Sequence, residues 1–120
     1  MNLNLKPKVS VIIPTYYRYE VLNDLLDQLS IQTVMPHEVI IVDQTPSNDR
    51  DNDILELHKG KLPIQLLFFN EPSLSKPRNY AAERSTGDIL LFCDDDIIVK
   101  NDFIESHINV MLKENVDVVN

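Results

Sequence analysis

The sequence contains little glycine, little cysteine and few basic side chains. Its glycines are Gly60 and Gly87, so it has no glycine-rich loop of the kind that binds phosphate after a first strand. Cys93 is the single cysteine, which excludes a disulfide framework and favours a reducing compartment. Lysine and arginine number 11 against 19 aspartates and glutamates, for a net charge of -8. This balance argues against nucleic acid as the main partner, because phosphate backbones require a basic surface.

Long apolar runs are also missing. No stretch approaches the roughly 20 residues needed to cross a bilayer, and the opening MNLNLKPKVS contains no apolar signal-peptide core. We therefore expect a cytoplasmic protein, located either in solution or at the cytoplasmic face of a membrane. Any membrane contact would be peripheral or made by segments beyond these residues. The 120 residues, 43% of them hydrophobic, suffice for one domain with a core.

Apolar periodicity predicts strands that alternate with helices. Uninterrupted apolar runs indicate buried strands, and apolar residues at helical spacing indicate amphipathic helices. The expected strands are 9–13, 38–43, 64–70, 88–94 and 116–119, and the expected helices are 19–31, 53–58, 78–86 (stopped by Gly87) and 101–115. Such alternation implies βαβ units with right-handed crossovers, and hence an α/β fold with a mainly parallel central sheet.

An acidic triplet follows the fourth expected strand. Asp94, Asp95 and Asp96 stand between the apolar runs ILLFC and IIV, although adjacent carboxylates repel one another. The carboxyl ends of parallel strands form the ligand-binding edge of such a sheet. A Mg²⁺ or Mn²⁺ ion relieves this repulsion, and it is usually held by one or two carboxylates plus substrate phosphates. The triplet therefore predicts a metal that holds a diphosphate, and the alternative is a solvated turn with helix-capping acids.

Three segments, in order, resemble family-2 glycosyltransferases, which are inverting enzymes with the GT-A fold. VSVIIPTYYR resembles V-S-V-I-I-P-T-Y-N-R, QTVMPHEVIIVDQTPSND resembles Q-T-x-x-x-x-E-I-I-V-V-D-D-G-S-x-D, and SKPRNYAAERSTGDILLFCDDDIIVKNDFI resembles A-R-N-x-G-x-x-x-A-x-G-x-x-x-x-F-L-D-x-D. The resemblance runs over essentially the whole chain. It implies a Rossmann-like three-layer α/β/α domain of the GT-A type, truncated here. Residues 1–120 would be its N-terminal part, which binds the donor nucleotide-sugar.

The resemblance assigns the base-binding end of the site to the first two segments. Pro14, Thr15 and Tyr16 would line the nucleotide-base pocket, with Tyr16 stacked on the base. Asp43 would accept a hydrogen bond from the base imide, which suits a UDP- or dTDP-linked donor. Tyr17 departs from the family pattern, which usually has asparagine at this position.

The third segment supplies the phosphate and metal end of the same site. By resemblance, Arg78 and Asn79 lie beside the nucleotide. Asp94 and Asp96 match the D-x-D motif. The resemblance makes Asp96 the main ligand of Mg²⁺ or Mn²⁺ and places Asp94 at the ribose or the metal. Asp95 takes the variable middle position of the nucleotide-sugar site, and it would face away from the other two if the triplet is extended.

The implied reaction transfers a sugar from a nucleoside diphosphate to an acceptor hydroxyl, with inversion, in polysaccharide biosynthesis. The metal would stabilise the leaving diphosphate, and a carboxylate base would deprotonate a carbohydrate or lipid-linked acceptor. The catalytic base is unknown, and we expect it beyond residue 120. We therefore expect the isolated chain to be inactive, and to self-associate through the open edge of its sheet.

Two other functions remain as alternatives. A nucleotidyltransferase of related fold would carry a glycine-rich, basic phosphate loop after its first strand, which the two glycines cannot supply. A Mg²⁺-binding signalling receiver domain would need an acid pair after the first strand and an aspartate after the third. In this sequence the first strand is followed by Pro14, Thr15 and Tyr16, and the third by Asn70.

Overall fold

The chain folds as the predicted alternation of strands and helices. The structure is a computed structural model that describes residues 7–51, 53–58, 60–70 and 75–113. Its elements are β1 (Val9–Thr15), α1 (Tyr19–Leu29), β2 (Glu38–Asp43), η1 (Ser47–Asp49), α2 (Asp53–His58), β3 (Ile64–Phe68), α3 (Lys76–Arg84), β4 (Ile89–Phe92) and α4 (Phe103–Lys113). The strand expected at 116–119 lies outside the described residues. Among these residues, no helix is both long enough and apolar enough to cross a bilayer.

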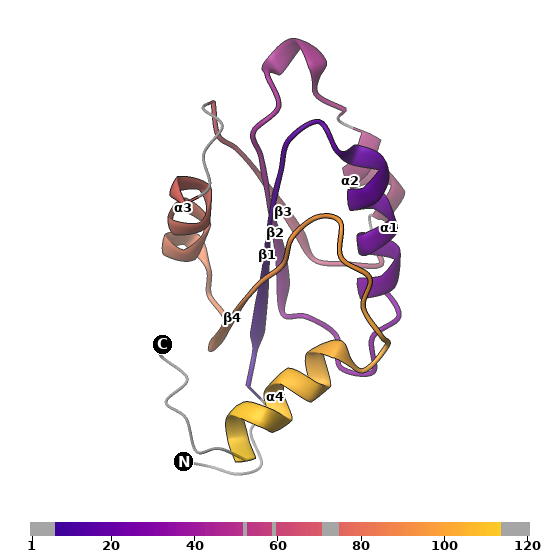
Figure 1. Cartoon of the computed structure of the whole chain (residues 1–120), viewed down its shortest axis with the longest axis vertical. Coiled ribbons are helices and arrows are strands. Elements are labelled where there is room, and N and C mark those ends of the chain that lie inside the picture. The colour runs from indigo at the N-terminus through magenta and orange to yellow at the C-terminus, as the bar shows by residue number, and fades with distance from the viewer. Residues whose placement is uncertain (1–6, 52, 59, 71–74, 114–120) are drawn as a thin grey trace.

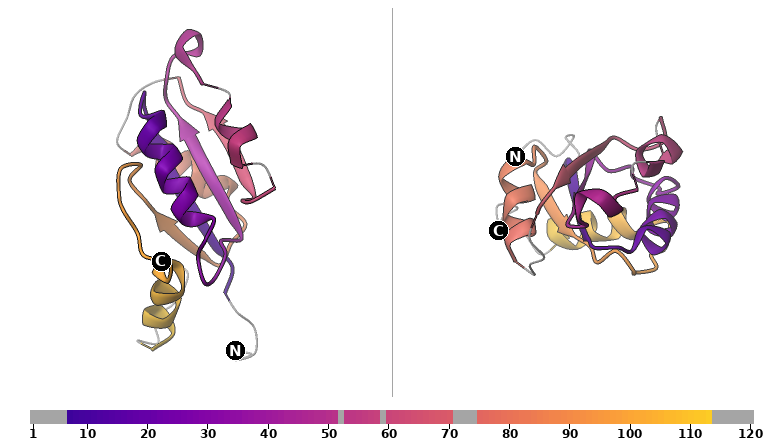
Figure 2. Two further views of the ribbon diagram at one scale, coloured as in Figure 1. Left: turned by 90° about the vertical axis from the view of Figure 1, so that its right-hand side faces the viewer. Right: turned by 90° about the horizontal axis from the view of Figure 1, so that it is seen from above.

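The four strands form one parallel sheet in the order β3-β2-β1-β4. β1 is central, and it pairs Val11 with Val39 of β2 and Ile12 with Phe92 of β4. Helix α3 covers one face of the sheet, whereas α1 and α2 cover the other (Figures 1 and 2). The predicted mainly parallel sheet and three-layer α/β/α arrangement of the GT-A type are confirmed.

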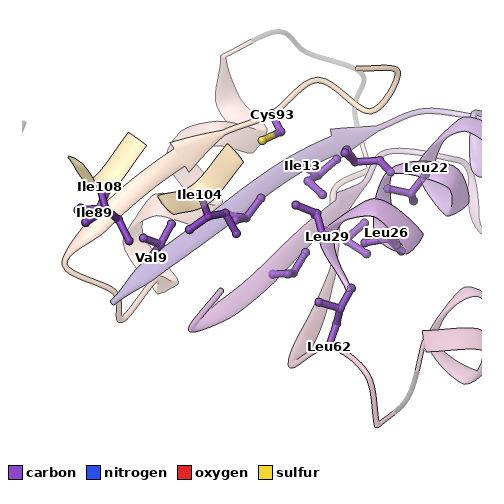
Figure 3. Packing of buried hydrophobic residues seen from close by; sticks show 14 residues of the cluster. Val9, Ile13, Leu22, Leu26, Leu29, Leu62, Ile89, Cys93, Ile104 and Ile108 are labelled. Atoms are coloured by element: carbon purple, nitrogen blue, oxygen red, sulfur yellow. The ribbon is translucent and has the colours of Figure 1, made fainter. Parts of the chain in front are cut away.

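The core lies on both faces of β1. Val11, Ile12 and Ile13 are each 0% exposed, as their uninterrupted apolar character predicts for a strand covered on both sides. The larger cluster combines alternate β1 residues with α1 and α4, and its labelled members are Val9, Ile13, Leu22, Leu26, Leu29, Leu62, Ile89, Cys93, Ile104 and Ile108 (Figure 3). Beneath α3, the smaller cluster consists of Ile12, Ile40, Val42 and Ala81. Burial raises the pKa of the Cys93 thiol to about 12, which suits its place in this core.

The first strand is longer than predicted because a proline fits inside it. β1 continues through Pro14 to Thr15, although a proline in a central strand usually removes a ladder hydrogen bond. The carbonyl of Ile12 accepts a bond from the backbone N–H of Cys93, so this side of β1 faces β4. Because β4 ends at Phe92, the partner of Ile12, no strand among the described residues stands opposite the nitrogen of Pro14. The predicted end of the strand at Ile13 was therefore wrong.

The predicted range 78–86 for the third helix was also wrong. Helix α3 begins at Lys76 and carries Pro77 in its first turn, where the missing N–H costs nothing because the first turn has no intrahelical acceptors for it. The helix ends at Arg84, and Gly87 is not its stop. Instead, Gly87 packs on the backbone of β1, where an added Cβ would lie 2.8 Å from the Lys8 carbonyl oxygen. The predicted ranges 38–43 and 53–58 match β2 and α2, whereas 19–31, 64–70, 88–94 and 101–115 differ from the observed elements at one or both ends.

A buried histidine joins α2 to α1. The side chain of His58 is 1% exposed, and its Nε2 lies 2.6 Å from Asn23 Oδ1. Because that oxygen can only accept, Nε2 carries the proton. His58 Nδ1 is buried, has no hydrogen-bond partner in the described part of the chain, and lies 3.8 Å from Asp27 Oδ1. Burial lowers the pKa of His58, Asp27 raises it in part, and Lys61 lowers it further.

This arrangement predicts a stability that falls in mild acid. Since the pKa of folded His58 lies below its ordinary 6.5, the unfolded chain binds the proton more readily than the folded chain. The contribution of neutral His58 to the free energy of unfolding is complete above the pKa of the histidine in the unfolded chain. It is lost as the pH falls through the lower pKa of His58 in the folded chain. Urea unfolding across this window is expected to show the decline for the wild type and a shallower decline for His58→Gln. Equal slopes for both proteins would contradict this assignment.

Candidate functional site

A cavity of about 380 Å³ lies at the carboxyl end of β1, beside the triplet that follows β4. Its lining residues are Pro14, Thr15, Tyr16, Arg18, Gln44, Arg78, Asp94, Asp95 and Asp96. The loops that leave β1 and β2 lie together at the top of Figure 1, where the ends of parallel strands place their ligand-binding residues. The cavity brings together all the predicted site residues except Asp43 and Asn79.

The acidic triplet forms a turn, so the premise of an extended triplet was wrong. Asp95 and Asp96 are turn residues, and the carboxylates at the two ends contact different arginines. Asp94 Oδ1 lies 3.4 Å from Arg78 Nη2 of α3, whereas Asp96 Oδ2 lies 2.8 Å from Arg18 Nη2. The side chains of Asp94 and Asp96 are 67% and 47% exposed, which leaves both accessible to a ligand in the cavity.

Asp95 is the buried member of the triplet, and it lines the cavity. The Thr15 hydroxyl donates to Asp95 Oδ2 at 2.9 Å, and Arg18 Nη1 lies 3.6 Å from Asp95 Oδ1. Burial raises the pKa of Asp95, while the Thr15 hydrogen bond and the Arg18 charge lower it. This middle carboxylate thus ties the end of β1 to the turn after β4.

Substituting Asp95 is expected to damage the fold. In Asp95→Ala the buried Thr15 hydroxyl loses its acceptor, and an unsatisfied buried polar group costs about 1–3 kcal/mol. The free energy of unfolding, measured with urea, is expected to fall by that amount. The double variant Thr15→Val/Asp95→Ala removes both partners and should lose less than the sum of the two single losses. Additive losses would show that the Thr15–Asp95 bond does not stabilise the fold.

Asp43 is buried under the β2–η1 loop and does not line the cavity. The Tyr19 hydroxyl donates to Asp43 Oδ2 at 2.6 Å, and the backbone N–H of Thr45 donates to Oδ1 at 2.9 Å. Burial and the hydrogen bond to Asp43 together raise the pKa of Tyr19. Gln44, the next residue, lines the cavity instead. Contact between Asp43 and a base remains a prediction, whereas its hydrogen bonds order the loop beside the cavity.

Two tyrosines follow Thr15, and the first of them, Tyr16, lines the cavity. Tyr16 is 42% exposed, and its ring packs edge-on against that of Tyr17 at a centroid distance of 4.8 Å. Tyr17 has a φ of 59°, a left-handed conformation that asparagine adopts more readily than tyrosine. Its backbone N–H donates to Thr45 Oγ1 at 2.9 Å, and its hydroxyl donates to Asp49, which raises its pKa to about 12. These bonds hold Tyr17 in the strained turn.

Two residues that line the cavity, Gln44 and Arg18, had no site role assigned from the sequence, and Arg18 is the one that contacts the acidic triplet. It is the N-cap of α1 and contacts both Asp95 and Asp96. The signal was present, since Arg18 is the last residue of the VSVIIPTYYR segment. Asn79, by contrast, is exposed on α3 and does not line the cavity.

The donor atoms of the cavity suit a hard cation that shares its ligands with a substrate. Within the described ranges, no group of three or more His, Cys, Asp or Glu side chains gathers to enclose a metal. Mg²⁺ and Mn²⁺ sites commonly use one or two carboxylates and take substrate phosphates and water as the other ligands. Asp94 and Asp96, exposed on the wall of the cavity, fit that partial ligand set.

A model of one protein family matches most of the chain. The family is described as "Glycosyl transferase family 2", and the match covers residues 10–120. The chain is 34% identical over 110 residues to "Uncharacterized glycosyltransferase YwdF" of Bacillus subtilis strain 168, covering 89% of this chain and 38% of the relative. It is 32% identical over 111 residues to "Poly(ribitol-phosphate) beta-N-acetylglucosaminyltransferase TarS" of Staphylococcus aureus strain Mu50, covering 83% of this chain and 19% of TarS.

Solved structures agree with these sequence matches. S. aureus TarS 1-349 in complex with UDP-GlcNAc superposes with a TM-score of 0.77 and 29% identity, over 90% of this chain and 32% of that one. The chain thus spans well under half the length of these two relatives.

Proposed function

The chain belongs to glycosyl transferase family 2, and on that premise we propose that it binds the nucleoside diphosphate sugar of a metal-dependent, inverting sugar transfer. The observation that carries this proposal is the cavity itself. Its lining combines the Tyr16 ring and small polar side chains with three carboxylates and two arginines. A nucleoside diphosphate presents the matching groups, an aromatic base and charged phosphates that can be bound by arginines and by a cation held on carboxylates.

The base end favours a UDP- or dTDP-linked donor in this proposal. Tyr16 offers a half-exposed ring for stacking, and an aromatic ring stacked on a base is worth about 1–3 kcal/mol in other proteins. Gln44 lines the cavity with an amide that can both donate and accept, which suits an imide edge. The solved relative with UDP-GlcNAc supports a uracil nucleotide.

At the phosphate end, Asp96 and Asp94 would hold Mg²⁺ or Mn²⁺. The cation would neutralise the charge that develops on the leaving diphosphate. Arg78 from α3 would contribute positive charge on the Asp94 side, where its guanidinium lies 3.4 Å from the carboxylate. The chain's own residues therefore bind and orient the donor, while Asp95 keeps the turn in place.

The acceptor side of the reaction requires residues beyond this chain. General-base catalysis requires a carboxylate within hydrogen-bond reach of the acceptor hydroxyl, and we place that base after residue 120. The acceptor would be a carbohydrate or a lipid-linked carbohydrate, presented in the cytoplasm or at the cytoplasmic face of a membrane. Leu90 and Phe92, exposed on the edge strand β4, would favour self-association of the isolated chain.

The proposal is tested by calorimetric titration with UDP, dTDP and CTP, each with and without Mn²⁺. We expect UDP or dTDP to bind tightly with Mn²⁺ and weakly without it. CTP that binds as well as UDP would favour the nucleotidyltransferase alternative. Tyr16→Ala is expected to weaken UDP binding by about tenfold, the loss that a missing base stack produces. The matched control is Tyr80→Ala, because Tyr80 of α3 packs against Phe69 and does not line the cavity.

A further inference from the structure

Arginine side chains already neutralise both ends of the acidic triplet. Arg18 Nη2 lies 2.8 Å from Asp96 Oδ2, and Arg78 Nη2 lies 3.4 Å from Asp94 Oδ1. The Arg18 contact is shorter, and Arg18 Nη1 also approaches Asp95 Oδ1 at 3.6 Å. The guanidinium of Arg18 thus stands beside the carboxylate that is proposed to bind the metal.

The backbone of Arg18 is held in place by its neighbours, whereas its side chain is half-exposed and reaches into the cavity. Tyr17 holds the turn before it with a φ of 59° and a backbone hydrogen bond to Thr45, and Arg18 itself caps α1. Its side chain is 51% exposed and lines the cavity. Arginine is not deprotonated in proteins, so the guanidinium stays charged wherever it moves.

A guanidinium and a divalent cation beside the same carboxylate repel each other, and screening by water weakens this repulsion without removing it. We propose, on the premise of the donor-binding function above, that Arg18 holds the place of the metal in the ligand-free chain. When the metal binds Asp96, Arg18 is released toward the diphosphate. Arg18 thereby opposes metal binding in the absence of nucleotide and strengthens nucleotide binding in the presence of metal.

This exchange couples the two ligands. The metal alone must break the Arg18–Asp96 pair, which lowers its affinity. When a diphosphate is present, the released guanidinium gains a charged acceptor, since arginine binds phosphate through its planar fork of N–H groups. Metal and nucleotide therefore bind more tightly together than the product of their separate affinities predicts, and linkage makes this gain reciprocal.

Arg18→Met tests the exchange, because methionine retains an apolar stem without the charge. Free Mn²⁺ is measured by electron paramagnetic resonance, without and with UDP, and UDP binding is measured by calorimetry at saturating Mn²⁺. Without UDP, Mn²⁺ is expected to bind Arg18→Met about fivefold more tightly than the wild type, the upper range for an exposed ion pair. At saturating Mn²⁺, UDP is expected to bind about tenfold more weakly, the loss of a charged hydrogen bond.

Two further variants separate charge from shape. Arg18→Lys keeps a positive charge but lacks the planar fork, so it should restore the low Mn²⁺ affinity without fully restoring UDP affinity. Arg84→Met is the matched control, because the Arg84 guanidinium packs over the Tyr80 ring at 3.6 Å. It should change neither affinity. Thermal unfolding confirms that each variant is folded.

The outcomes distinguish this inference from the proposed function. An unchanged or lower Mn²⁺ affinity in Arg18→Met overturns the exchange. If UDP binding by that variant still requires Mn²⁺, the proposed donor-binding function remains supported although the exchange is overturned. An unchanged UDP affinity also overturns the exchange, because Arg18 would then not reach the diphosphate. Failure of the wild type to bind Mn²⁺ even with UDP overturns both.

Discussion

Asp96→Ala is expected to abolish the Mn²⁺-dependent binding of UDP while leaving the fold intact. The Asp96 side chain is 47% exposed, its carboxylate is held by Arg18, and it lines the cavity. Removing it would delete the proposed ligand of the cation, which in turn is proposed to hold the diphosphate. Calorimetry of the variant should show the same residual UDP binding with and without Mn²⁺. The midpoint temperature of thermal unfolding should change little, because an exposed ion pair contributes at most about 1 kcal/mol to stability.

The neighbouring acids provide the controls for this result. Asp94→Ala is expected to weaken the Mn²⁺-dependent binding without abolishing it, because we propose Asp94 as a supporting ligand only. Asp95→Asn, which keeps an acceptor for Thr15, should bind Mn²⁺ and UDP much as the wild type does. Loss of metal-dependent binding in Asp95→Asn, with retention in Asp96→Ala, would reverse the roles that we assign to the two residues.

Gly87→Ala is expected to destabilise the fold more than any of the single substitutions in the cavity. A Cβ at this position would lie 2.8 Å from the Lys8 carbonyl oxygen and 2.8 Å from the Ser10 backbone nitrogen. Both neighbours are backbone atoms, so neither can rotate away. Gly87 also donates to Ser10 Oγ at 2.8 Å, and the Ser10 hydroxyl donates to Glu38 at 2.6 Å. Overpacking of this kind costs about 1–3 kcal/mol, and loss of the hydrogen bonds would add to it.

The second glycine is a matched control for this prediction. Gly60 has a φ of 87°, but an added Cβ there would meet no atom within 4 Å. Gly60→Ala therefore costs only the backbone strain of a left-handed residue, roughly 1–2 kcal/mol. Urea unfolding gives the free energy of unfolding of both variants, and so compares backbone strain in Gly60→Ala with a steric clash in Gly87→Ala. A smaller loss in Gly87→Ala than in Gly60→Ala would show that β1 and the Gly87 turn separate easily.

Local pattern in the sequence was sufficient to predict the sheet. The apolar runs at Val11–Ile13 and in β2 are buried on both faces, and alternation with amphipathic helices permits few topologies other than a parallel sheet. The gathering of Pro14–Tyr16 with Asp94–Asp96 followed from the same rule, because parallel strands end at one edge. The acidic triplet at that edge predicted a metal and a diphosphate, and the family resemblance added the nucleotide-sugar and the roles of single residues, which periodicity alone does not identify.

Contacts between distant residues could not be predicted in this way. The bond from Thr15 to Asp95 joins residues 80 positions apart, and that from Arg18 to Asp96 joins residues 78 apart. Nothing local distinguishes Asp95, which is buried, from its two exposed neighbours, because that difference arises from the turn that follows β4. Similarly, Pro14 ends a strand in most contexts, and only the early end of β4 permits it in this sheet.

The most direct test of donor binding at this edge is a crystal structure of the protein with UDP and Mn²⁺, using the anomalous scattering of manganese. We expect one manganese peak between the Asp96 carboxylate and the diphosphate. We also expect the uracil beside Tyr16 and the Arg18 side chain moved away from Asp96. Manganese bound to other carboxylates, or UDP bound outside the cavity lined by Pro14, Tyr16 and Asp96, would contradict donor binding at this edge.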